Sequence, residues 1–234
     1  MRQDLVFRLD HFSGELPLFP LSNAVFFPQT LWPLHVFENR YRALLREALE
    51  GERLIGMALL KPGWENTYHD SPDIFPVGCL ARIVKETRLH DGRYNIILMG
   101  LHRVRIVCEI QKSPYRRAAV KILKDSYKYS DAGARRIIEI RNQLTGVYME
   151  LCERLCGDRD KVRKILESPL PLGLLVDLLT ATLKFDIYKK QEILAQTDVA
   201  RRAQLLFGLL SEPQYEPAAC RDPLSEFRLR FGLN

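Results

Sequence analysis

The hydrophobic pattern changes once along the chain, near residues 125–131, and this change limits the possible folds more than any other feature. Before it, apolar residues form short alternating or continuous runs, as β-strands do. After it, they recur every three or four positions, as on one face of a helix. The clearest series is Ile137, Ile140, Leu144, Val147, Leu151 and Leu155. Strands followed by helices predict an α+β protein.

The first part is predicted to consist of strands interrupted by one helix. Strand-like runs cover residues 15–21, 23–28, 30–37, 53–61, 75–89, 92–110 and 112–124. Pro33 lies inside one of these runs, which indicates an edge position or a bulge. Asp91 and Gly92 separate two long β-rich runs and predict a hairpin. Helical spacing over residues 38–50 predicts a helix that ends at Gly51.

The second part is predicted to be helical throughout. A long amphipathic helix should run from about Asp131 until Gly157 and Asp158 end it, with shorter helices at 160–167, 171–183, 188–196 and 198–210. The segment from Pro213 onward is expected to be a tail that docks on the body or frays. The predicted domains are therefore 1–128 (β-rich), 129–211 (helical) and 212–234 (C-terminal tail).

Composition favours a folded protein of the cytoplasm. The 234 residues are 47% hydrophobic and 27% charged, which allows a core and argues against disorder. No apolar run reaches the roughly 18 residues that a membrane-spanning helix needs, and Asp4 and Asp10 interrupt any secretory signal. We therefore expect no membrane association.

The five cysteines are odd in number and scattered, so no disulfide framework is indicated. Cys152 and Cys156 are four residues apart without a histidine nearby, which does not make a zinc site. We expect buried structural thiols and no metal. The net charge of +6 is spread along the chain without a dense Lys/Arg tract, and supports only a weak preference for acidic partners.

Sequence motifs of catalysis are lacking, so no catalytic residue and no cofactor are predicted. Gly51 and Gly56 have the spacing of a phosphate-binding loop, but Met57 and Ala58 replace its lysine and hydroxyl residue. His69 and Asp70 are the least improbable catalytic pair, and a plain polar loop is the favoured interpretation. A hydrolase built on them is the third-ranked hypothesis.

Two sets of side chains are candidates for binding. Trp64 and Tyr68 lie in the polar loop KPGWENTYHDS (Lys61–Ser71), where aromatic side chains could form an exposed contact surface. Arg103 and Arg105 alternate along a strand and could contact an anion, although pairing with surface carboxylates is favoured. The aromatic cluster of Phe26, Phe27 and Trp32 is expected to be core.

Three stretches together resemble the N-terminal domain of the Lon proteases. They are LPLFPLSNAVFFPQTLWPLHVFENRY (Leu16–Tyr41), VGCLARIVKETRLHDGRYNIILMGLHRVRI (Val77–Ile106) and KKQEILAQTDVARRAQLLFGLL (Lys189–Leu210). The resemblance implies a PUA-like β pseudo-barrel followed by a small helical bundle. It carries over no specific binding residue, because the family's substrate contacts are not fixed by a sharp motif.

In the family this domain recognises unfolded or tagged substrates, while an ATPase and a Ser–Lys protease follow it. The expectation is a stand-alone, non-catalytic protein-binding module or adaptor, an ATP-dependent protease La homologue lacking catalytic domains, whose partner is a protein or unfolded polypeptide. The alternative is a PUA-like protein that binds RNA or a small ligand. Nucleic acid would require a basic groove, and the evenly spread charge argues only mildly for one.

Overall fold

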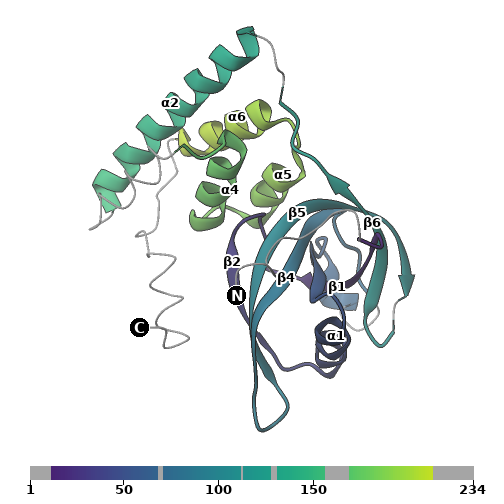
Figure 1. Cartoon of the computed structure of the whole chain (residues 1–234). Coiled ribbons are helices and arrows are strands. Elements are labelled where there is room, and N and C mark those ends of the chain that lie inside the picture. Colours follow the sequence, from purple (N-terminus) through teal and green to yellow (C-terminus); the bar gives the residue numbers. More distant parts are fainter. Residues whose placement is uncertain (1–11, 68–70, 112, 128–130, 156–168, 213–234) are drawn as a thin grey trace. The chain divides into compact units, whose positions relative to one another are not determined.

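The computed structural model describes residues 12–67, 71–111, 113–127, 131–155 and 169–212. The chain divides into two compact units, Met1–Lys124 and Asp125–Asn234 (Figure 1). The first holds β1 (Glu15–Leu21), β2 (Leu31–Val36), α1 (Asn39–Glu50), β3 (Leu54–Leu59), β4 (Val77–Arg88), β5 (Tyr94–Gln111) and β6 (Arg116–Leu123). The second holds α2 (Asp131–Leu155), α4 (Leu172–Thr182), α5 (Ile187–Ala195) and α6 (Val199–Leu210).

The strands of the first unit form one sheet that closes on itself. The order is β2-β5-β4-β3-β1-β6, and β5 also pairs with β6, so five of the strands make a ring while β2 adjoins the first half of β5. The β1–β3 pair is parallel, because β2 and α1 form the crossover between these strands. The predicted α+β class, a pseudo-barrel followed by helices, is confirmed.

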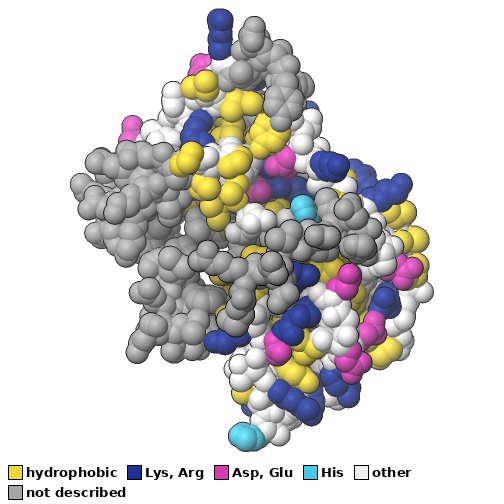
Figure 2. Space-filling view, viewed as in Figure 1, with side chains coloured by type: hydrophobic (Ala, Val, Ile, Leu, Met, Phe, Trp, Pro, Cys, Tyr) yellow, Lys and Arg dark blue, Asp and Glu magenta, His cyan; other side chains and the backbone are white. Residues whose placement is uncertain are grey.

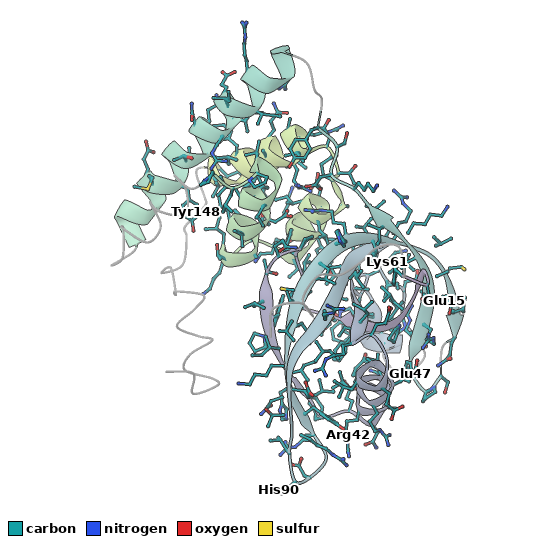
Figure 3. The ribbon with its side chains drawn as sticks, viewed as in Figure 1. Glu15, Arg42, Glu47, Lys61, His90 and Tyr148 are labelled. Carbon is teal, nitrogen blue, oxygen red and sulfur yellow. The ribbon has the colours of Figure 1, made fainter. Side chains whose placement is uncertain are left out.

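The β4–β5 hairpin forms where Asp91 and Gly92 predict it. Gly92 has a φ of +80°, a conformation that glycine adopts without steric cost. A side chain here would also collide with the Arg42 guanidinium of α1. Asp91 accepts hydrogen bonds from the backbone and the side chain of Arg93. These bonds lower the pKa of the Asp91 carboxyl. In Figure 3, His90 marks the hairpin tip and Arg42 lies beside it.

The expectation of an edge position for Pro33 is confirmed, because in the described part of the chain β5 is the only strand that pairs with β2. The carbonyl of Thr30, next to β2, accepts a hydrogen bond from the Gly100 amide of β5. Backbone groups alternate between the two edges of a strand. The backbone groups of Trp32 and Leu34 therefore point toward β5. Those of Pro33 point toward the open edge, where its missing N–H costs the sheet no hydrogen bond.

The expected strand at 23–28 is wrong. This run is buried at Val25, Phe26 and Phe27, yet it forms a loop and turn. The Phe27 carbonyl accepts from the Thr30 hydroxyl instead of a neighbouring strand, and it approaches Gly100 so closely that a Cβ there would lie 2.2 Å from this oxygen. Burial without strand pairing explains the continuous apolar run.

Two hydrophobic clusters fill the first unit. The larger one joins α1 to one face of the sheet and includes the stacked rings of Phe19 and Tyr41, 4.1 Å apart. It also contains Phe26, against which Trp32 packs edge-on. The smaller cluster lies on the other face and consists of Leu16, Leu18, Leu54, Leu80, Leu101, Val104, Ala118 and Val120.

In the second unit the described helices follow the predicted spacing, with α2, α4, α5 and α6 each within one or two residues of the expected bounds. The carboxylates of Asp186 and Asp198 cap α5 and α6 by accepting backbone N–H bonds. The expected helix at 160–167 and the tail lie outside the described residues. Among the described helices, none is long and apolar enough to cross a membrane.

Candidate functional site

Backbone pairing joins the two ends of the loop that carries the predicted aromatic contacts. Leu60 and Ile74 form an antiparallel bridge, and the Lys61 amide donates to the Asp73 carbonyl at 2.8 Å. The Lys61 ammonium also lies 3.4 Å from the Asp73 carboxylate. These bonds fix the two ends of the loop relative to β3 and β4.

Trp64 begins a short 3-10 helix, Trp64–Thr67, inside this loop. Its side chain is half-buried, while Pro62, Gly63, Glu65 and Asn66 are exposed. Trp64 therefore presents only part of its ring to solvent, less than a polar loop suggested. Tyr68, His69 and Asp70 lie outside the described residues, so the Trp64–Tyr68 contact surface and the His69–Asp70 pair stay predictions.

A buried arginine joins the end of this loop to the β5–β6 ladder. Arg116 donates to the Pro72 carbonyl at 2.6 Å and to both oxygens of Glu109, at 2.7 and 2.5 Å. A two-pronged bond to a carboxylate is among the stronger and more directional contacts in proteins. Sequence reasoning missed this clamp, because Arg116 and Glu109 meet only through strand pairing.

The two arginines predicted on one face of a strand have different environments. Arg103 is buried and Arg105 is exposed. Within the described residues Arg105 has no carboxylate partner and stands directly opposite Lys121 of β6. The expected pairing of Arg105 with a surface carboxylate is therefore not found there, because the register places a second cation beside it.

Large apolar side chains are exposed at several places outside the loop. Leu31 lies on β2 and Phe37 just after it, with 52% and 61% of their surfaces exposed. Val107 and Ile110 lie on β5, with 53% and 48% exposed. None of these residues was predicted as a contact from the sequence, although the broken alternation IVCEI after Arg105 is a signal for irregular pairing.

The thiols divide into two kinds. Cys79 is buried, as expected, whereas Cys108 is exposed on β5. The expectation of a buried structural thiol is wrong for Cys108, because a register shift beside it changes which side chains face inward. Cys152, Cys156 and Cys220 have no described side chains. In the described part of the chain, no three His, Cys, Asp or Glu side chains gather as a metal site would require.

The second unit contains a buried charge network centred on Arg202 of α6. Its guanidinium donates to both oxygens of Asp125, at 2.8 and 2.6 Å, and lies 3.6 Å from a carboxylate oxygen of Asp177. Burial lowers the pKa of Arg202, but the bonds to Asp125 and the charges of Asp177 and Asp125 outweigh it and raise the pKa overall. We interpret this network as structural, because Arg202 has no exposed surface.

The fold defines a class of protein: a β pseudo-barrel in one unit and helices in the other. The family model of the "ATP-dependent protease La (LON) substrate-binding domain" matches residues 15–212. The chain belongs to this family.

Relatives of known sequence agree with this assignment. The chain is similar to a Lon protease of Anaeromyxobacter dehalogenans, 29% identical over 196 residues that cover 84% of this chain. It is equally similar to Lon protease 2 of Myxococcus xanthus, again 29% identical over 84% of this chain. In both cases it spans only 23% of the relative's length.

Two solved structures share the fold. The N-terminal domain of a Lon protease from the Mycobacterium avium complex aligns with a TM-score of 0.64 and 16% identity, over 85% of this chain and 99% of the other. A Lon N-terminal domain protein from Xanthomonas campestris aligns with a TM-score of 0.56 and 21% identity, over 83% of this chain and 97% of the other.

Proposed function

We propose that this chain is a non-catalytic module that binds exposed polypeptide segments, either of an unfolded substrate or of a partner protein. The observation that carries the proposal is the match of residues 15–212 to a substrate-binding domain. Exposed Leu31, Phe37, Val107 and Ile110 on the first unit support it, since such side chains can bury apolar surface of a bound chain.

Catalysis is not part of this proposal. Residues 15–212 match a binding domain and no catalytic domain. The segment with the glycine spacing of a phosphate-binding loop also has an unsuitable geometry. Gly51 ends α1, and Gly56 lies inside β3 opposite Leu18. We expect the purified chain to hydrolyse neither ATP nor casein above background. Turnover that a point substitution in this chain abolishes would contradict the proposal.

We propose a cytoplasmic location for the protein. The thiols of Cys79 and Cys108 are compatible with a reducing compartment. Adaptor activity, in which the module delivers a bound chain to another protein, is an extension of the same proposal.

The test is a binding titration with an unfolded model protein and, separately, a structured RNA, each at low and high salt. Apolar binding should depend little on salt, whereas phosphate-driven binding weakens by orders of magnitude as salt rises. Trp64→Ala should weaken polypeptide binding, and Glu65→Ala, an exposed neighbour, is the matched control. Binding of RNA alone, with a steep salt dependence, would contradict the proposal.

A further inference from the structure

The register between β5 and β6 is interrupted twice, and each interruption exposes an apolar side chain. Val107 and Ile110 are the residues that the pairing skips, the first between Ile106 and Cys108 and the second between Glu109 and Gln111. Their exposed fractions are 53% and 48%. A β-bulge inserts an unpaired residue and re-aims side chains, and bulges are frequent next to functional sites.

Both bulges lie in one stretch of the β5–β6 ladder, and we call the group of residues around them the β5–β6 strip. Its members are Arg105, Val107, Cys108 and Ile110 of β5 together with Ala119 and Lys121 of β6. The other face of the same ladder carries Val104, Ala118 and Val120, which are buried in the smaller cluster. Figure 2 shows hydrophobic and basic side chains side by side at the edge of the molecule where Figure 1 places β6.

At one end of the strip lie two cations, and no described residue supplies a counter-ion to them. Arg105 and Lys121 are directly opposed across the ladder and both are exposed. In the described part of the chain, neither side chain takes part in an ion pair or a hydrogen bond. Like charges in directly opposed positions destabilise a sheet. The neighbouring Arg116 and Arg117 both have glutamate partners, so this arrangement differs from the rest of the ladder.

We propose that the β5–β6 strip binds an extended acidic and apolar polypeptide segment. Apolar side chains of the segment would cover Val107 and Ile110, and a carboxylate would lie between Arg105 and Lys121. Such a carboxylate relieves the repulsion between the cations, which a basic segment would increase. This inference rests on the proposed function and adds to it a location and a preference for acidic over basic chains.

The test uses two fluorescent peptides with the same leucine and valine positions, one with aspartates between them and the other with lysines. Fluorescence anisotropy should show that the intact protein binds the acidic peptide at least about tenfold more tightly, a difference of about 1.4 kcal/mol. Val107→Thr combined with Ile110→Thr keeps β-branched side chains on the strand and should weaken the acidic peptide about tenfold.

Replacing Arg105 and Lys121 together with glutamine should abolish the preference for the acidic peptide and leave the residual apolar binding. The matched control is Ile138→Thr, which removes an exposed apolar side chain of α2 and should change neither affinity. Circular dichroism of each variant checks that the fold is retained.

Cys108 supplies a readout at the strip itself. Its thiol is exposed between the two bulges, so bound acidic peptide should slow its alkylation, measured by peptide-level mass spectrometry. One outcome is that the protein binds unfolded polypeptide while the strip variants bind it as the wild type does and Cys108 stays reactive. In that case the strip is not the binding site, and the proposed function stands. If no polypeptide binds, both are wrong.

Discussion

Each unit contains a buried arginine that bonds to a carboxylate, Arg116 in the first and Arg202 in the second, and these two are held differently. Arg116 of the first unit joins Glu109 and the Pro72 carbonyl, and Glu109 keeps 21% of its side chain exposed. Arg202 of the second unit joins Asp125 and Asp177, and Asp177 keeps only 3% exposed. In the first unit the charge reinforces strand pairs that already fix the fold. In the second it joins the segment before α2 to α4 and α6, three parts of the chain far apart in sequence.

Removing Arg202 should therefore have the largest effect. Arg202→Met leaves Asp125 and Asp177 without their cation, and breaking a buried pair from one side costs about 3–5 kcal/mol. Denaturant unfolding followed by far-UV circular dichroism should show an early helical transition. Arg201→Ala, the exposed neighbour, should change stability by less than about 0.5 kcal/mol. Equal effects of the two substitutions would contradict the structural role of the network.

Lys190 provides a pH-dependent test of the helical unit. Burial lowers the pKa of its ammonium to about 8, and the ammonium donates to the Ala181 carbonyl near the end of α4. Between about pH 8 and 10.5 the unfolded chain binds more protons at Lys190 than the folded chain. This residue's contribution to the free energy of unfolding therefore rises with pH across that window and is lowest below pH 8.

Lys190→Met should accordingly stabilise the second unit at pH 7, by about 1–3 kcal/mol after the lost hydrogen bond is allowed for. The gain should shrink as pH rises and vanish near pH 10.5. Lys189→Met, at an exposed neighbouring position, should show no such pH dependence. Denaturant titrations at pH 7, 8.5 and 10 measure the stability gained by each variant. A gain for Lys190→Met that grows with pH would contradict the lowered pKa of Lys190.

Arg116→Met should lower the unfolding free energy of the first unit by about 2 kcal/mol. This is a smaller loss than the one expected for Arg202→Met in the second unit. Glu109 can turn toward water, which limits the cost, although the Pro72 carbonyl loses its donor. Hydrogen exchange should quicken at the base of the loop, at Lys61 and Phe75, whose amides donate across it. Unchanged exchange there would show that Arg116 does not hold the loop.

The smallest change in stability is expected at the open edge of β2. Pro33→Val restores an N–H that points away from β5, beside the exposed Leu31, so the variant should self-associate while its unfolding free energy changes by less than about 1 kcal/mol. Analytical ultracentrifugation would detect the association. His35→Val raises apolar character on the same strand without adding a donor, and should stay at the wild-type association state.

The sequence predicted much of the fold because many of its elements depend on local signals. The period of α2, the Asp91–Gly92 turn and the edge position of Pro33 each depend on residues a few positions apart. The run at 23–28 was wrongly predicted as a strand, because a buried loop and a buried strand can have the same continuous apolar pattern.

The sequence by itself determined the α+β class, the change from strands to helices and the membership suggested by three motifs. Tertiary structure alone decided which charges meet. Arg116 reaches Glu109, Arg202 reaches Asp125 and Asp177, and Arg105 stands against Lys121 only because strand register and helix packing bring them together. The two bulges that expose Val107 and Ile110 are likewise properties of a pair of strands. Pairing energies depend on both partners at once, so neither strand's sequence contains them.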